Sequence, residues 1–279
     1  THSLTHSLTH SLTHSLTYSL THLFTHSLTY SLNSIIQFTS HLLRSAQGLI
    51  FRSVDKLFES KRALTEGIAG QDWTVNIQVE MLEVYNENVK DLMGGVDDLK
   101  LNDNEPVGSR IVNVENELDV EKILAIAMKK RVSKSTNSND VSSRSHLIFT
   151  ILFNAENSRN SGMNRNGKLH ICDLCGSERL NKSGANERAD LLKETQCINS
   201  SLSCLANVVE KLQNKSEHVP FRDSKLTYLL QNSLSGDSKT LAIVCCSPLP
   251  VHYHESLCSL RFASRVNRVE LKKQEKVTL

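Results

Sequence analysis

Apolar residues change their spacing along the chain, and each spacing predicts a different element of secondary structure. From about residue 41 to Phe58 they recur at helical intervals, which predicts a helix that stops at Glu59-Ser60-Lys61. Between Trp73 and Tyr85 apolar and polar residues largely alternate, which is typical of a strand. The next residues, Asn86–Met93, are expected to form a short helix that Gly94-Gly95 ends.

The rest of the chain continues this alternation of helices and strands. A turn-rich region covers residues 98–116 and contains short strand pieces near Leu99–Leu101 and Arg110–Val114. The later elements, in chain order, are a helix that Asp119 caps and that runs to about Arg131, strands over His146–Ala155 and Lys168–Leu174, helices over Ala189–Leu212 and Asp223–Ser233, a buried strand over Thr240–Cys246 and a helix over Glu255–Val269. This order predicts an α/β layered fold in which helices flank a central sheet.

The N-terminal segment has a different pattern. Residues 1–32 repeat Thr-His-Ser-Leu every four residues and contain six of the twelve histidines. These residues are middling helix formers, and no charge pairs would support a helix here. The codons ACT-CAC-TCA-CTC encode the repeat and are themselves a repeat of four bases, and the departures Tyr18, Leu23 and Phe24 are each one base away. We interpret residues 1–40 as a translated simple-sequence tract, disordered or arbitrary in structure; weak metal binding by its histidines is the alternative.

Composition narrows the class of protein. The chain has 279 residues, enough for a sizeable core, and its net charge of +2 creates no basic field that would demand a nucleic-acid partner. Its seven cysteines lack the spacing of a disulfide framework, which fits a reducing compartment. No apolar stretch reaches the roughly 18 residues of a membrane span, and no signal peptide is recognised. A cytosolic protein is therefore expected.

Two polar segments carry candidate chemistry. The loop from Asn139 to His146 places the adjacent hydroxyls of Ser142 and Ser143 before a strand, where they can hold Mg²⁺ or a phosphate oxygen; an ordinary Ser-rich loop is the alternative. A later strand delivers Asp173 at its C-terminal end, as in a Walker B motif, and Gly176 lets a backbone N–H approach a terminal phosphate. Cys172 and Cys175 are spaced like zinc ligands, but no second Cys/His pair completes a site.

A third segment, His218–Thr227, completes an ordered set of motifs. The set comprises NxxSSRSH at 139–146, DLCGSE at 173–178, HVPFRDSKLT at 218–227, Ser238-Lys239-Thr240-Leu241 and Leu260-Arg261-Phe262-Ala263. Together these resemble the kinesin motor family over about residues 48–269. Cys175 departs from the family's DLAGSE.

The resemblance implies a role for each matching residue. In kinesins two switch loops close around the γ-phosphate of MgATP, so ATP and Mg²⁺ are the implied ligands. By this resemblance the residues that would bind the nucleotide and its metal are Asn139, Ser142, Ser143 and Asp173. Of these, Ser143 and Asp173 would lie on the Mg²⁺ side. The residues that would serve catalysis are Arg144, Gly176, Glu178 and Asn199. Arg144 and Glu178 would form the salt bridge that closes the loops, Gly176 would sense the γ-phosphate, and Asn199 would help to order the site.

One family motif has no match in this sequence. The P-loop reads G-x-x-x-x-G-K-[ST], and the only Gly-Lys pair here is Gly167-Lys168, followed by Leu169. The resemblance therefore predicts a kinesin-like P-loop NTPase fold without its N-terminal strands and P-loop, which by itself does not bind ATP productively. Three interpretations stay open: an incomplete sequence of a microtubule-stimulated ATPase motor, a non-enzymatic microtubule-binding pseudo-motor, or a non-functional gene-model product.

The expected partner is the microtubule, because the family binds tubulin and tubulin is acidic. The matching cations and the histidine between them are Lys211, Lys215, His218, Arg222 and Lys225. Without the family context, a solvated charged loop is the simpler interpretation. Ser200 and Tyr228 stand where kinesins usually carry Lys and Arg, which weakens the patch, and Leu191 replaces a usual Arg in the switch II region.

The resemblance also divides the chain and suggests its setting. Residues 41–270 are expected to form a partial motor domain and residues 271–279 a basic tail. No neck linker or heptads follow Arg265-Val266-Asn267, which resembles C-terminal, kinesin-14-like motors; a truncated gene model would look the same. Dimerisation would need a stalk outside this sequence, no nucleic acid or membrane is expected as a partner, and the expected location is the cytoplasmic microtubule cytoskeleton, including the spindle.

Overall fold

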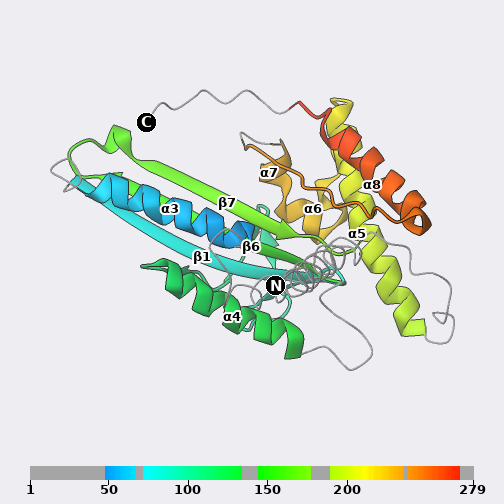
Figure 1. Ribbon diagram of the computed structural model, residues 1–279, viewed down its shortest axis with the longest axis horizontal. Helices are drawn as coiled ribbons and strands as arrows, with labels where there is room; N and C mark the ends of the chain where they lie inside the picture. Colours follow the sequence, from blue (N-terminus) through cyan, green and yellow to red (C-terminus); the bar gives the residue numbers. More distant parts are fainter. Residues whose placement is uncertain (1–47, 67–71, 134–143, 177–188, 236–237, 271–279) are drawn as a thin grey trace, which may run out of the picture.

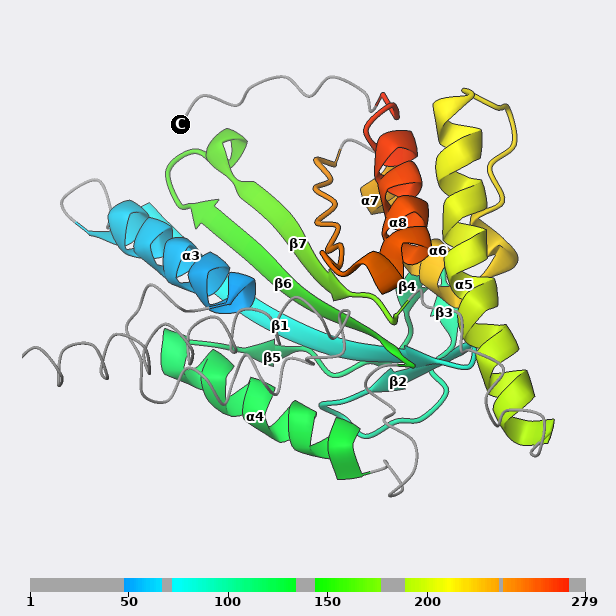
Figure 2. The ribbon, with the colours of Figure 1, turned by 45° about the vertical axis from the view of Figure 1, so that its right-hand side comes forward.

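The computed structural model describes residues 48–66, 72–133, 144–176, 189–235 and 238–270, of which 132–133 and 189–199 are described by their backbone alone (Figure 1). The repeat of residues 1–40 and the tail 271–279 lie outside these ranges, so the predictions made for them remain predictions. A twisted antiparallel sheet carries helices on both faces, and each face has its own apolar core (Figures 1 and 2). The predicted α/β layered architecture is therefore confirmed.

Strand β1 lies at the centre of the sheet and has the predicted bounds. In sheet order the strands are β2 (Asn88–Asp91), β1 (Trp73–Tyr85), β6 (His146–Asn157) and β7 (Arg165–Asp173), and β5 (Val112–Asn113) also pairs with β1. In the register of the three long strands, Met81 lies opposite Phe149 and the next residue, Leu82, opposite Ile148. Successive side chains of a strand point to opposite faces, so Met81 and Leu82 enter different cores.

Helices α3 (Leu49–Thr65) and α4 (Glu117–Ser133) cover one face of the sheet. Buried residues from both, including Val54, Phe58 and Leu124, pack against β1 and β6. Helix α3 does not stop at residues 59–61 as predicted. None of these three residues breaks a helix, and Leu64 still packs against the core one turn later.

The start of α4 also corrects a prediction. Asp119 was expected to cap this helix, but the helix begins two residues earlier, at Glu117. The side chain of Asn116 accepts the backbone N–H of Asp119 at 3.1 Å, and Asp119 accepts the N–H of Glu115 at 3.2 Å. Asn116 therefore caps the helix and Asp119 supports the turn before it.

The segment Asn86–Met93 is a hairpin with β2 rather than the predicted helix. Asn86 and Glu87 have φ angles of 52° and 57°, the left-handed values of a tight two-residue hairpin turn. Beyond the turn, Asn88 pairs with Tyr85 and Val89 pairs with Val84. Helical spacing in so short a segment was misleading, because burying Val89 beside β1 decides its conformation. In the turn-rich region, β3 (Leu101–Asn102) lies at the end of the predicted piece Leu99–Leu101, and β5 lies within the predicted piece Arg110–Val114. β3 forms a small hairpin with β4 (Glu105–Pro106), which was not predicted.

Helix α5 (Ala189–Gln213) lies on the other face, close to its predicted bounds. The predicted helix Asp223–Ser233 is broken into three pieces: the 3-10 helix η6 (Phe221–Asp223), α6 (Lys225–Leu229) and α7 (Gln231–Ser235). The break at Ser224 arises because this residue is extended, with φ −144° and ψ 155°, and its side chain caps α6. Leu226 and Leu230 thereby reach the core formed with Leu82, Val84 and Leu205.

The last described region contains the largest departure from prediction. Residues 240–246 form no strand, and none of their apolar side chains is buried, with Leu241 at 83% and Ile243 at 57% of full exposure. No strand in the described part of the chain pairs with them. A buried strand needs a partner for its backbone and a cover for its side chains, and neither is present here. The turn η7 (Pro250–His252) and helix α8 (Tyr253–Val266) follow, α8 close to where Glu255–Val269 was predicted.

A buried network at the ends of the sheet strands

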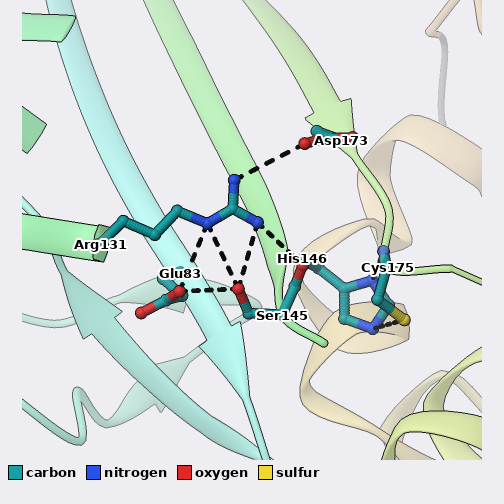
Figure 3. A network of polar contacts seen from close by, with 6 residues as sticks. All are labelled: Glu83, Arg131, Ser145, His146, Asp173 and Cys175. Carbon is teal, nitrogen blue, oxygen red and sulfur yellow. Dashed lines mark hydrogen bonds and ion pairs between the residues drawn. The ribbon is translucent and has the colours of Figure 1, made fainter. Parts of the chain in front are cut away.

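A buried arginine joins three elements at one end of the sheet (Figure 3). Arg131, from the last turn of α4, is 2% exposed and donates from Nη2 to the carbonyl oxygen of Ser145 at 3.1 Å and to its hydroxyl at 3.2 Å. Glu83 of β1, also 2% exposed, lies 3.5 Å from the Arg131 Nε and accepts the Ser145 hydroxyl at 2.7 Å. Two opposite charges therefore share one serine, which satisfies groups that would be costly to bury unpaired.

The same guanidinium reaches Asp173 at the C-terminal end of β7. The Arg131 Nη1 and Asp173 Oδ2 are 3.6 Å apart, and the Asp173 side chain keeps 24% of its exposure. Burial raises the pKa of the Asp173 carboxyl, and the charge of Arg131 opposes that rise. Asp173 is thus a partly accessible carboxylate that Arg131 holds in one orientation. A carboxylate that faces a cation or its water ligand needs to be held in this way.

His146, at the start of β6, joins this end of the sheet to α5. Its Nδ1 accepts the backbone N–H of Cys175 at 3.1 Å, and its Nε2 lies 2.8 Å from the hydroxyl of Ser201. Because Nδ1 accepts, the proton of the neutral ring is on Nε2 and is donated to Ser201. Burial, assisted by the positive charge of Arg131, lowers the pKa of His146 to about 4, so the ring is neutral near pH 7.

The structure brings together those parts of the two predicted loops that it describes. The last residues of the first loop (Ser145 and His146) and those of the second (Asp173 and Cys175) touch Arg131 or one another. Arg144 precedes Ser145, and Gly176 follows Cys175 and is buried. Asn139, Ser142, Ser143 and Glu178 lie outside the described residues, as does the side chain of Asn199 in α5. The salt bridge between Arg144 and Glu178 therefore remains a prediction.

Sequence reasoning missed the residues at the centre of the network. From the sequence, Arg131 was expected only to mark the end of a helix, and no role was predicted for Glu83. One signal was available, because Glu83 follows Val79 and Met81 on the inward face of the strand. A carboxylate in such a position needs a buried cation or a donor, and this requirement indicates a site before the structure is known.

The two cysteines of the CxxC spacing show no sign of a metal centre. Burial and the nearby Asp173 raise the pKa of the Cys172 thiol to about 12, which disfavours the thiolate that binds zinc. Among the described residues, no three His, Cys, Asp or Glu side chains converge as metal ligands. No helix in the described ranges has the length and apolar character needed to cross a membrane.

The five residues of the predicted tubulin-binding patch all lie between the end of α5 and the start of α6. Lys211, Lys215, His218 and Arg222 are exposed. Lys215 forms an ion pair with Glu270 at 2.8 Å, and both side chains are 75% exposed. The Arg222 guanidinium lies over the ring of Tyr228, 5.6 Å from its centroid.

Comparison with known proteins assigns the family. The model of the kinesin motor domain matches residues 24–269. Kinesin-like protein KIN-14N of Oryza sativa subsp. japonica is 44% identical over 243 residues, which are 82% of this chain and 31% of the relative. Carboxy-terminal kinesin 2 of Xenopus laevis is 41% identical over 233 residues, 80% of this chain and 35% of the relative.

A solved structure agrees with these relatives. The motor domain of the kinesin-like protein Kar3 of Saccharomyces cerevisiae superimposes with a TM-score of 0.67 at 40% identity, over 85% of this chain and 72% of that one. The chain belongs to the kinesin motor domain family, and the relatives above include kinesin-14 and carboxy-terminal kinesins. It spans about a third of the length of the curated relatives it matches.

Proposed function

We propose that these residues form the switch half of a microtubule-based motor ATPase. The observation that supports this most is the single buried network in which Arg131 contacts Ser145 on one side and Asp173 on the other. A γ-phosphate bound beside both loops would be sensed by both, and any shift in one would reach the other through the shared guanidinium. His146 extends the connection to α5, the helix that leads to the basic patch.

The residues present fit the implied ligand, MgATP, only on the side of its γ-phosphate and Mg²⁺. Asp173 offers a half-buried carboxylate for a water ligand of Mg²⁺, and Ser142 and Ser143 would supply hydroxyls. Arg144, Gly176, Glu178 and Asn199 would order the γ-phosphate and the attacking water, and Asn139 the loop before them. When bound, Mg²⁺ supplies charge neutralisation to the phosphates.

The phosphate cradle that would complete this site has no sequence match within residues 1–279. We infer that this polypeptide, tested alone, binds MgATP weakly, and that hydrolysis needs a glycine-rich loop from outside this sequence. Titration of the purified chain with a fluorescent ATP analogue in Mg²⁺ tests this. Micromolar affinity would overturn it.

Microtubule binding is the second part of the proposal. The patch is Lys211, Lys215, His218, Arg222 and Lys225. All of these except the half-buried Lys225 are exposed, so they can face an acidic surface. Co-sedimentation with microtubules at two salt concentrations tests this directly. Binding that weakens as salt rises is expected, and no binding at low salt would contradict the proposal.

A chimera separates the motor from the alternative interpretation, a pseudo-motor that binds microtubules without hydrolysing ATP. We would join the upstream motor residues of the rice relative to residues 48–270 and measure ATP hydrolysis with and without microtubules. A motor predicts microtubule-stimulated hydrolysis that Asp173→Asn abolishes while microtubule binding persists. A pseudo-motor predicts binding without hydrolysis in either chimera. Cytoskeletal location, and dimerisation through a stalk outside these residues, follow from the same proposal.

A further inference from the structure

The turn between β1 and β2 does more than reverse the chain. Its two residues, Asn86 and Glu87, hold left-handed backbone angles, which fix the direction of the Glu87 side chain. The Glu87 carboxylate accepts the backbone N–H of Lys225, with Oε2 and N 2.6 Å apart, across 138 residues of sequence. A sheet turn and the first residue of α6 are therefore joined by a charge-assisted hydrogen bond in a partly buried position.

This bond completes the start of α6. The first backbone N–H groups of a helix have no partner inside it and need acceptors from elsewhere. Ser224 satisfies the N–H of Thr227 at 3.1 Å, and Glu87 satisfies that of Lys225. The Thr227 hydroxyl donates to the carbonyl of Phe221 at 2.6 Å, which closes the corner between η6 and α6. Within this corner, Glu87 is the acceptor that comes from the sheet.

Cations stand on both segments that the bond joins. On the helix side Arg222 lies over Tyr228, and on the hairpin side the Lys90 ammonium lies 5.4 Å from the centroid of the Tyr85 ring. The aromatic faces hold both cations near the surface without neutralising them. Beneath them, Val84 and Val89 of the hairpin pack in the same core as Leu226 of α6.

We propose that Glu87 is a positioning residue for the microtubule-binding surface, an inference that rests on the function proposed above. It holds the η6–α6 corner against the β1–β2 hairpin. Arg222, Lys225 and Lys90 therefore keep one fixed arrangement when they meet an acidic partner. A pre-arranged set of charges loses less conformational freedom on binding than a mobile one. Glu87 itself touches no partner in this proposal.

The sign of the effect separates positioning from simple charge. Glu87 is negative, so its removal should strengthen attraction to acidic tubulin if only net charge matters. Positioning predicts the opposite, because loss of the acceptor frees the start of α6. Glu87→Ala removes both charge and acceptor, whereas Glu87→Gln removes the charge but keeps a carbonyl oxygen. Glu217→Ala is the matched control, because it removes an equal charge from an exposed position in the loop before η6.

The experiment measures microtubule co-sedimentation of the full chain and its three variants at one salt concentration. Loss of one charge-assisted bond predicts that Glu87→Ala binds about 3- to 10-fold more weakly. Glu87→Gln should bind within about 2-fold of the unchanged chain, and Glu217→Ala equally well or slightly more tightly. Glu87→Ala binding as tightly as Glu217→Ala would overturn the proposal.

Amide hydrogen exchange over residues 221–229, without microtubules, provides the second measurement. We expect faster exchange in Glu87→Ala, by about 5-fold or more, and near-normal exchange in Glu87→Gln. Unchanged exchange in Glu87→Ala would show that the turn does not hold α6. If the unchanged chain fails to bind microtubules, the proposed function is wrong, and the exchange result still decides whether Glu87 orders the corner.

Discussion

Strand β1 and the segment 240–246 have similarly apolar sequences but opposite environments. In β1, Ile77 and Val79 are at most 1% exposed, between β6 on one side and the helices α3 and α4 above. In the later segment, Leu241 and Ile243 are more than half exposed, and residues 238–270 contain no buried residue at all. An apolar sequence therefore allows burial, but a segment is buried only where a neighbouring element packs against it.

The region around β1 and residues 238–270 also differ in how they are held to the rest of the molecule. Residues 238–270 meet the rest of the described chain mainly through α8, which lies beside α5 (Figure 2). The links there include ion pairs such as Arg265 with Glu210, 3.5 Å apart and exposed. The first region has a buried apolar core and a buried charge network instead. We therefore expect substitutions in the two regions to have very different effects on stability.

The largest effect is expected at the charge network of the first region. Arg131→Ala should lower the free energy of unfolding by about 3–5 kcal/mol, because it leaves Glu83 buried without its cation. Urea unfolding followed by circular dichroism measures this. Arg52→Ala, at an exposed position of α3, is the control and should change little. A loss below about 1 kcal/mol for Arg131→Ala would show that water or other groups replace the guanidinium.

A matched pair of substitutions tests the comparison itself. Leu124→Ala removes a fully buried side chain of α4 and should cost about 2–5 kcal/mol. Ile243→Ala removes an exposed side chain and should cost less than about 0.5 kcal/mol in this polypeptide. The same unfolding experiment serves both. Equal costs would mean that residues outside the described ranges cover Ile243, and the comparison would fail.

The third effect concerns pH and arises at His146, which joins the end of the sheet to α5. The pKa of His146 is lowered from 6.5 to about 4, so the unfolded chain binds a proton at a higher pH than the folded chain does. The stability that the neutral ring contributes is complete above pH 6.5 and is lost as the pH falls towards 4, by on the order of 3 kcal/mol at most. Unfolding midpoints at pH 7.5, 6 and 5 measure the loss.

His146→Gln isolates this contribution from other groups. Glu80 and Asp173 have raised pKa values, so their contributions have the opposite sign: they favour the folded state at low pH and lose that advantage as pH rises. The variant should therefore lose less stability than the unchanged chain between pH 7.5 and 5. An identical pH dependence would mean that His146 is not the group responsible.

The smallest effect is expected at the ion pair of Lys215 and Glu270. Both side chains are largely exposed, so Glu270→Gln should leave the unfolding midpoint unchanged. The same change should slightly strengthen microtubule binding, because Lys215 loses its internal competitor, and salt should reduce the difference. A clear fall in the midpoint would show that this pair holds the C-terminal region in place.

Long periodic segments were predictable from the sequence, whereas short ones were not. The bounds of β1 and α5 were predicted almost to the residue, because many positions agree on one period. Asn86–Met93 was wrong because eight residues fit a helical and a strand period about equally well, and packing of Val89 decided between them. Within the candidate site, Asp173 was found by its place at a strand end, but Arg131 was not.

The sequence by itself determined the family, the longest elements such as β1 and α5, and the place of Asp173 at a strand end, because local periodicity and motifs carry this information. Only the tertiary structure decided that Arg131 serves Ser145 and Asp173 together, and that Glu87 reaches Lys225. The physical reason is that such contacts join residues far apart along the chain, and their energies depend on burial and geometry. Burial also separated β1 from residues 240–246, since apolar residues stabilise a fold only where a neighbour excludes water from them.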